Sequence, residues 1–260
     1  MKEKLTIVKV GGAVVEDEAQ LARLLKDFAA IEGHKILVHG GGRRATKIAG
    51  ALGIESRMVD GRRITDAKML EVVTMVYGGL VNKSLVARLQ ACGINALGLT
   101  GADMNAVQSH KRPLKNGIDF GFVGDVDHVN GYALQLLLQQ GITPVIAPLT
   151  HDGQGNILNT NADTMASEVA KALSRFFNVT LIYCFEKPGV LRNPADEASL
   201  IPVITHEEFS GYVADGTVSG GMIPKLENAL AAVDHGVSKV IITLATAIDG
   251  KHGTVIQRRK

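Results

Sequence analysis

The stretch Leu5-Thr6-Ile7-Val8-Lys9-Val10-Gly11-Gly12 decides the fold class. Its apolar and β-branched residues predict a buried strand that ends near Val10, and the two glycines predict a compact turn directly after it. Open α/β sheets bind their ligands at the carboxyl ends of the strands. Lys9 and the Gly11-Gly12 turn are therefore expected at a ligand site.

Strand-like and helix-like segments alternate outward from this stretch along most of the chain. Strands are expected over residues 35–39, 95–99, 143–147, 179–184 and 239–244, and helices over 17–31, 42–52, 66–92, 132–140 and 162–173. This order predicts an α/β fold in which helices cover both faces of a parallel sheet. The length of 260 residues suits one core or two lobes in close contact, and no stretch is typical of a linker.

The segment 66–92 predicts a long helix with an apolar stripe. Thr65-Asp66 supplies an N-cap, and glycines at 78 and 79 predict close packing, against either a dimer partner or a neighbouring element of the same chain. The residues of the stripe are Met69, Val72, Val73, Val76 and Leu80.

The overall composition excludes several classes of function. A formal charge of +2, 4% aromatic residues and no Trp argue against a nucleic-acid-binding surface. No apolar stretch reaches the roughly 20 residues of a membrane span, and Met1-Lys2-Glu3-Lys4 leads directly into a strand, so we expect a cytoplasmic protein without a membrane partner. Cys92 and Cys184 are expected to be reduced, buried thiols.

Three glycine-rich turns indicate that the ligand is a phosphate. They are Gly11-Gly12, the run His39-Gly40-Gly41-Gly42, and the segment Ser219–Lys225 that opens a late helix. Backbone N–H groups at such turns and at helix N-termini can bind anions. Lys9 and Lys225 add cations, whereas no Walker loop and no dinucleotide GxGxxG motif is present. The sequence therefore predicts a different phosphate-binding fold.

Polar residues elsewhere add candidates for the same site. In the segment Asn159–Asp163, an N-cap role explains Asn161 but leaves Asp163 free to hold two ammonium groups in position. Arg63 has the planar fork that suits a substrate carboxylate, with an exposed salt bridge as the alternative. His39 is interpreted as a packing or turn residue.

These motifs, in this order and spacing, identify a resemblance to the amino-acid kinase family over nearly the whole chain. They are KVGG from Lys9, HGGG from His39, DGRRIT around Arg63, NTNAD over Asn159–Asp163, and SGGMIPK ending at Lys225. Within the family the chain is most similar to the kinases of arginine biosynthesis whose acceptor is an N-acylated glutamate. The resemblance implies a three-layer αβα sandwich with a mostly parallel central sheet, as in carbamate kinase. It also implies an N-terminal lobe, 1–177, for the acylglutamate and dimerisation, and a C-terminal lobe, 178–260, for ATP.

The resemblance also implies roles for individual residues. Those implied for catalysis are Lys9, Lys225 and Asp163. Those implied for the acceptor are Gly41, Gly42, Arg63 and Asn159. Those implied for the nucleotide are Gly11, Gly12, Glu186, Gly189, Thr217, Val218 and Ser219. Glu186 departs from the family, which usually has Asp at this position.

The implied reaction is transfer of the ATP γ-phosphoryl group to the γ-carboxylate of N-acetyl-L-glutamate, giving the 5-phosphate. The carboxylate is ionised at neutral pH, so the reaction needs cations and backbone donors rather than a general base. Mg²⁺ is expected mainly on the nucleotide phosphates, with no metal site of the protein's own. The alternatives are an N-succinyl-L-glutamate kinase, another family member such as glutamate 5-kinase, aspartokinase, carbamate kinase or uridylate kinase, and a catalytically silent metabolite sensor.

The resemblance further implies a homodimer. Arginine-inhibited, hexameric members of the family carry an additional helix before the first strand, whereas four residues precede it here. The helix expected over 66–92 is the implied dimer contact.

Overall fold

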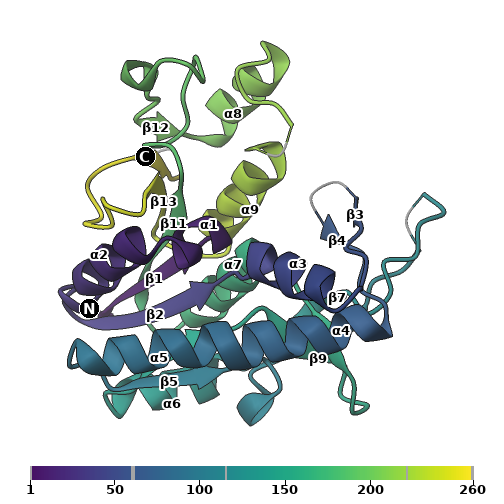
Figure 1. The fold of residues 1–260 in the computed structure, drawn as a ribbon. Coiled ribbons are helices and arrows are strands. Elements are labelled where there is room, and N and C mark those ends of the chain that lie inside the picture. Colours follow the sequence, from purple (N-terminus) through teal and green to yellow (C-terminus); the bar gives the residue numbers. More distant parts are fainter. Residues whose placement is uncertain (1, 60–61, 115, 221, 259–260) are drawn as a thin grey trace.

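The computed structural model describes residues 2–59, 62–114, 116–220 and 222–258. Within them, eight strands form a central sheet in the order β12-β14-β13-β11-β1-β2-β8-β5 (Figure 1). The strands are β1 (Lys4–Val10), β2 (His34–His39), β5 (Ala96–Leu99), β8 (Thr143–Ile146), β11 (Asn178–Phe185), β12 (Val203–Ile204), β13 (Lys239–Leu244) and β14 (Thr254–Ile256). Pairing is parallel from β13 through β5, and β14 runs antiparallel to β13. The predicted α/β class with a mostly parallel sheet is confirmed.

Alternate residues of the central strands pack against different helix layers. Ile7 contributes to a core with helices α6 (Gly131–Gln139), α7 (Ala162–Leu173) and α9 (Met222–Asp234). Its neighbour Val8 contributes to a second core with helices α2 (Glu18–Ala29), α3 (Gly42–Ala51), α4 (Ala67–Val73) and α5 (Asn82–Ala91). Side chains of a strand point alternately to its two faces. The chain is therefore the predicted three-layer αβα sandwich.

Two smaller sheets lie near the carboxyl ends of the central strands. One has the order β10 (Ile157–Asn159), β9 (Leu149–His151), β6 (Val107–Lys111) and β7 (Gly124–Val129), and the other is the hairpin of β3 (Met58–Val59) and β4 (Arg62–Arg63). Strands β6 and β7 pair antiparallel, and Asn116 and Gly117 in the connection between them have φ values of 51° and 74°. The sequence analysis missed β9 and β10, helix α8 (His206–Ala214) and the short helix α1 (Gly12–Glu16). Of the residues in the motifs that it singled out, Asp60, Gly61 and Gly221 lie outside those described.

The long helix is interrupted by a π-helical segment, η1 (Thr74–Val81). The predicted stripe is correct as far as Val76, but Leu80 is 43% exposed and Tyr77 and Val81 are buried in its place. A π-turn takes more residues than an α-turn and so shifts the buried face along the sequence. Gly78 packs against Leu149 of β9. A Cβ placed on Gly78 would lie 3.4 Å from Leu149 Cδ1. Within the described part of the chain, the neighbours of Gly78 are therefore Leu149 of β9 and Thr100 after β5, whose Cγ2 would lie 3.6 Å from that Cβ.

The helical stretch Ala67–Ala91 also meets the length and composition of a membrane span. Of its most apolar 18 residues, 44% are buried inside the molecule. By length and composition alone this is weak evidence of a span, because the stretch also carries Lys68, Glu71, Lys83 and Arg88. A core helix meets the same criterion, and eight side chains of this stretch form part of the core beside the sheet: Met69, Val72, Val73, Val76, Tyr77, Val81, Leu85 and Leu89.

The two cysteines differ in their surroundings. Cys184 is buried at the end of β11, where desolvation raises the pKa of its thiol to about 12. Cys92 is exposed, which contradicts the expectation that both thiols are buried. It is the residue that directly follows α5 and ends that helix.

The sheet order places three strand ends together. β1 lies between β2 and β11, with Lys9 opposite Val38 on one side and Tyr183 on the other. The next strand along the chain, β2, is added to one side of β1, and the later β11 is added to the other. Ligands of open α/β sheets bind at such a reversal of strand order.

Candidate active site

Two glycine turns meet at the carboxyl ends of β1 and β2. A Cβ placed on Gly40 would lie 3.2 Å from the backbone nitrogen of Gly12, so a larger residue at position 40 would push the turns apart. Helix α3 begins directly after Gly41, and no side chain caps its first turn. The N–H groups of that turn therefore face the site as donors for an anion.

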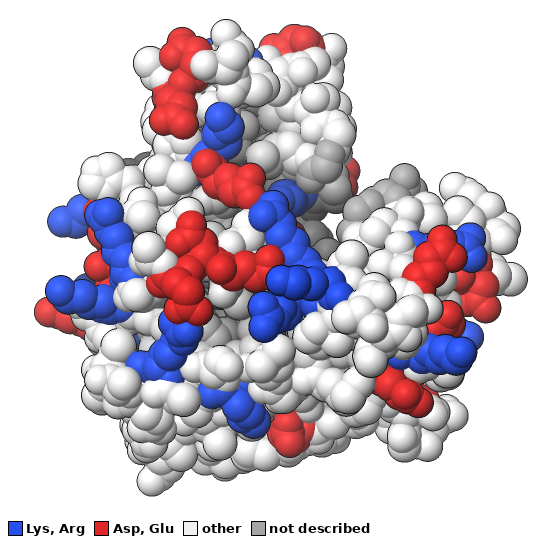
Figure 2. Space-filling view, in the orientation of Figure 1, with Lys and Arg blue, Asp and Glu red and all other residues white. Residues whose placement is uncertain are grey.

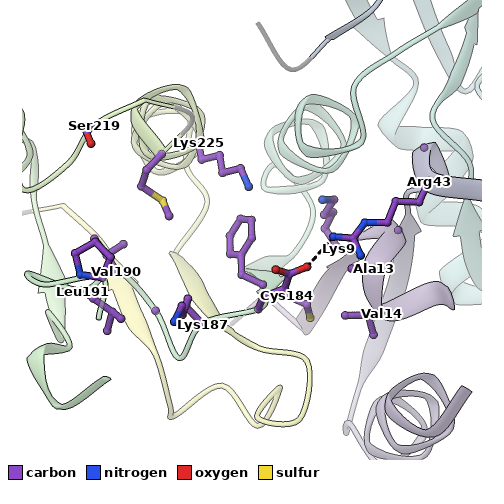
Figure 3. A pocket seen from close by; sticks show the side chains of 18 of the residues that line it. Lys9, Ala13, Val14, Arg43, Cys184, Lys187, Val190, Leu191, Ser219 and Lys225 are labelled. Atoms are coloured by element: carbon purple, nitrogen blue, oxygen red, sulfur yellow. Dashed lines mark hydrogen bonds and ion pairs between the residues drawn. The ribbon is translucent and has the colours of Figure 1, made fainter. Parts of the chain in front are cut away.

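A large pocket of about 610 Å³ opens beside these turns. Figure 2 shows Lys and Arg side chains gathered around a hollow in the middle of this face, and Figure 3 shows Lys9 and Lys225 entering the pocket from different elements. Of the residues predicted for catalysis and nucleotide binding, those lining it are Lys9, Gly11, Gly12, Glu186, Gly189, Thr217, Ser219 and Lys225. Val218 does not line it, because its side chain lies in the hydrophobic core and is 2% exposed.

Lys9 forms a buried ion pair with Asp163. The Nζ–Oδ1 distance is 2.7 Å, and the two side chains are 10% and 12% exposed. Asn161 caps α7 by accepting from the backbone N–H groups of Asp163 and Thr164, which fixes the first turn of the helix. Removal of one partner of a buried pair leaves an uncompensated charge, so each partner depends on the other for its position.

Lys225 lies in the first turns of α9 and has a different environment. No ion pair within the described part of the chain includes it. Burial lowers the pKa of its ammonium group. The nearby negative charge of Asp163 opposes this decrease, whereas the positive charge of Lys9 adds to it. The Phe185 ring contacts the group, with its centroid 3.9 Å from Lys225 Nζ. Phe185 was not predicted, because a Phe that ends a buried strand gives no signal beyond core packing.

A small pocket of about 180 Å³ lies on the other side of the Gly40–Gly42 turn. All four residues predicted for the acceptor line it: Gly41, Gly42, Arg63 and Asn159. Gly42 lines both pockets and so marks where they meet. Ligands in the two pockets would face one another across this glycine.

Arg63 is buried in the small pocket. The side chain donates from Nη2 to the Gly42 carbonyl (2.9 Å) and to Thr46 Oγ1 (2.8 Å), and from Nη1 to Ser56 Oγ. These partners are neutral, and the residue is 7% exposed, so the alternative of an exposed salt bridge was wrong. A buried guanidinium with neutral partners can still bind a carboxylate.

Asn159 and Tyr77 complete the walls of the small pocket. Asn159 donates from Nδ2 to Thr65 Oγ1 over 2.9 Å. The ring of Tyr77 lies against Gly41, where an added Cβ would come within 2.8 Å of Tyr77 Cδ1. Burial raises the pKa of the Tyr77 hydroxyl, and the charge of Arg63 opposes that change. Sequence reasoning missed Tyr77 because its inward position depends on the π-helical segment.

His39 and Asn82 support the turn between the two pockets. His39 is fully buried, with Nδ1 2.8 Å from the Gly40 carbonyl and Nε2 3.1 Å from Asn82 Nδ2. Desolvation lowers the pKa of the imidazole to about 4, so it is neutral at pH 7. In the neutral tautomer that fits both contacts, Nδ1 donates to the carbonyl and Nε2 accepts from the amide. This arrangement confirms the interpretation of His39 as a turn residue.

An exposed ion pair crosses the rim of the large pocket. Arg43 Nη2 of α3 lies 3.0 Å from Glu186 Oε1 after β11, and both side chains are more than 60% exposed. It links an element of the N-terminal half to one of the C-terminal half. Such exposed pairs contribute little to stability.

The combined arrangement favours chemistry between two anions. Two lysines and uncapped backbone N–H groups face the large pocket, and a buried arginine faces the small one. Positioned cations and backbone donors stabilise the charge that develops on a transferring phosphoryl group.

Comparison with known proteins agrees with this geometry. Residues 4–244 match the model of the amino acid kinase family. The chain is 66% identical to acetylglutamate kinase from Bacteroides fragilis, over 99% of this chain and 98% of that one, and 66% identical to acetylglutamate kinase from Phocaeicola vulgatus, over 99% and 100%. Among solved structures, its fold is similar to that of N-acetylglutamate synthase from Neisseria gonorrhoeae, with a TM-score of 0.83, 20% identity, and coverage of 98% of this chain and 60% of that one. The chain belongs to the amino acid kinase family.

Proposed function

We propose that the chain is a kinase that transfers the γ-phosphoryl group of ATP to the γ-carboxylate of N-acetyl-L-glutamate. The observation that carries the proposal is the pair of pockets meeting at Gly42, with the Lys9–Asp163 ion pair and Lys225 beside the larger one. The relatives with 66% identity over nearly the full chain bear the name of this activity.

The small pocket is proposed to bind the acceptor. Arg63 would pair with the α-carboxylate, and Asn159 would bind the amide region, while the backbone of Gly41 and Gly42 would bring the γ-carboxylate toward the larger pocket. The volume and polar lining suit a small amphipathic anion. The pocket is lined by residues 40–162 alone, which supports the assignment of residues 1–177 as the acceptor lobe.

The large pocket is proposed to bind ATP, because membership of the kinase family implies the use of ATP. Its lining comes from residues 9–43 and 184–225, which supports residues 178–260 as the lobe that carries most of the nucleotide contacts. Gly11, Gly12, Gly189, Thr217, Ser219 and Glu186 would contact the nucleotide. Val218 would contribute through its backbone, since its side chain faces the core.

The lysines are proposed to neutralise the transferring phosphoryl group. Lys9 is anchored by Asp163, and Lys225 approaches from α9. The acceptor is already an anion, so attack on phosphorus needs no general base, and the neutral His39 is engaged in the turn.

Mg²⁺ is proposed to enter on the phosphates of ATP, where it would neutralise part of their charge. The charged side chains in the lining of the large pocket are mainly cations, and with the glycine backbone they suit phosphate oxygens rather than a metal ion. Glu186, the carboxylate in its described lining, already pairs with Arg43, and Asp163 behind Lys9 pairs with that lysine.

We also propose a homodimer that functions in the cytoplasm. The outer side of the helical stretch Ala67–Ala91 exposes Met75 (55%) and Leu80 (43%), and Leu97 of the adjacent β5 is 38% exposed. Sedimentation equilibrium of the wild-type chain and of Met75→Lys/Leu80→Lys tests this interface. A dimeric wild type and a monomeric variant are expected, and a monomeric wild type would contradict the proposal.

The proposed activity is tested by ATP consumption with four acceptor conditions. They are N-acetyl-L-glutamate, N-succinyl-L-glutamate, free glutamate and no acceptor, with hydroxylamine present to trap the acyl phosphate as a hydroxamate. We expect acceptor-dependent turnover and hydroxamate with N-acetyl-L-glutamate. Turnover confined to the succinyl compound would reassign the acyl group, and no turnover with any acceptor would contradict the proposed function.

A further inference from the structure

Phe185 lies between the two lysines of the large pocket. It is the last residue of β11, half-buried, and lines the pocket. Its ring centroid is 3.9 Å from Lys225 Nζ and 6.0 Å from Lys9 Nζ. An ammonium group within about 6 Å of an aromatic centroid is attracted by the ring's negative face. The shorter distance makes Lys225 the main partner of the ring.

The two lysines differ in what fixes them. Asp163 fixes Lys9 through the ion pair of 2.7 Å, whereas Lys225 has no ion pair with any described residue. The charged groups that face Lys225 are Asp163 from α7, Lys9 from β1 and Glu186 after β11. Asp163 is engaged with Lys9, and Glu186 is engaged with Arg43. The ring is therefore the partner that remains for the Lys225 ammonium.

We infer that Phe185 is a positioning residue for phosphoryl transfer, whose ring holds the Lys225 ammonium in the pocket by a cation–π contact. This inference rests on the proposed function of the pocket. A carboxylate in the place of the ring would cancel the lysine charge and compete with phosphoryl oxygens. An aromatic face restrains the long, flexible lysine chain and leaves its positive charge available. Phe185 acts through Lys225 and needs no contact with substrate.

The kinetic test replaces Phe185 with 4-fluoro-, 3,5-difluoro- and 3,4,5-trifluorophenylalanine. Fluorine withdraws electron density from the ring face and changes its shape little, so the contact weakens in steps. We expect kcat to fall with each fluorine, reaching a loss of roughly fivefold to thirtyfold, while KM for N-acetyl-L-glutamate stays within twofold. The matched control is the same series at Phe177, a core residue that is 3% exposed. That series should leave kcat unchanged.

The pH profile separates this role from simple packing. The ring favours the charged form of Lys225, so the trifluoro enzyme should lose kcat at a lower pH on the basic side than the wild type does. The inference would be overturned if kcat and the basic side of its pH profile stay constant along the fluorinated series, even if Phe185→Leu is inactive. In that case the role of the residue would be one of shape.

A measurement on the resting protein does not depend on turnover. In ¹H–¹³C NMR spectra, the ε-methylene signal of Lys225 is assigned through its loss in Lys225→Arg. The ring should shift this signal upfield in the wild type. In Phe185→Leu the signal should return toward the ordinary lysine position. An unshifted signal in the wild type would overturn the contact itself. If the wild type phosphorylates none of the acceptors but the signal is shifted, the proposed function fails and the Lys225–Phe185 contact stands.

Discussion

The two pockets on either side of Gly42 are built in different ways. In the small pocket the polar side chains are buried and hydrogen-bonded to the protein, as with Arg63 to Gly42 and Asn159 to Thr65. In the large pocket the cations lie beside apolar walls, and the ion pair at the rim is exposed. The small pocket is thus organised in advance to select a ligand. In the proposed reaction, the cations of the large pocket would stabilise the transition state, which increases the rate.

The largest effect is expected from Lys225→Ala in the large pocket. Loss of one cation from the transferring phosphoryl group should lower kcat on the order of 100- to 1,000-fold, because its charge acts mainly in the transition state. Steady-state kinetics with N-acetyl-L-glutamate measures this, and Lys225→Arg, which keeps the charge, should retain more activity than the alanine variant. Unchanged turnover in Lys225→Ala would remove the residue from the mechanism.

The next largest effect concerns His39, which supports the turn that both pockets share. Burial lowers its pKa to about 4, below the ordinary 6.5, so the folded state binds its proton less readily than the unfolded state. The stabilisation from the neutral imidazole is complete above pH 6.5 and is lost as the pH falls toward 4, by about 3 kcal/mol at most. Urea unfolding of the wild type at pH 7 and pH 4 measures this loss.

The control for the histidine is His39→Gln. Several carboxylates, including Asp125, also have lowered pKa values and destabilise the fold as they protonate, so the readout is the difference between the two proteins. The variant should lose less stability than the wild type over the same pH range. Equal losses would show that His39 does not cause the pH dependence.

A smaller effect, confined to binding, is expected from Arg63→Ala in the small pocket. Loss of charge-assisted hydrogen bonds to the acceptor carboxylate should raise KM for N-acetyl-L-glutamate roughly 10- to 100-fold, with a lesser change in kcat. Arg44→Ala, an exposed arginine on α3, is the matched control and should behave as the wild type. A loss confined to kcat would contradict the division between the pockets.

The smallest effect is expected at the rim of the large pocket. Arg43→Ala removes the exposed pair with Glu186 and should change KM for ATP by about threefold or less, with a difference from the wild type that fades at high salt. Kinetics at two ionic strengths tests this. A loss of tenfold or more would show that the pair closes the pocket rather than merely bordering it.

The sequence predicted those parts that depend on local patterns. Strand ends and glycine turns pointed to Lys9, Gly41 and Gly42, which line the two pockets, and Asn161 caps α7 as its position in the sequence suggested. The motifs shared with the family also predicted a common site for Arg63 and Asn159, and both residues line one pocket although they lie far apart in the chain. These features are encoded by short segments whose chemistry is visible without a fold.

The parts that were missed depend on tertiary contacts. An α-helical period places Leu80 inside, but the π-helical segment turns Tyr77 toward Gly41 instead. The ring of Phe185 between two lysines follows from the approach of β1 and α9, which are more than 200 residues apart in the sequence. Cys92 was expected to be buried because it lacks a partner at disulfide or metal-ligand spacing, whereas in the fold it is exposed directly after α5.

The most direct test of the difference between the pockets is isothermal titration of Lys225→Ala with N-acetyl-L-glutamate. If the small pocket binds the acceptor independently of the cations in the large one, the variant should bind within threefold of the wild-type affinity despite its loss of turnover. A loss of affinity that matches the loss of turnover would contradict the account and make Lys225 part of acceptor binding.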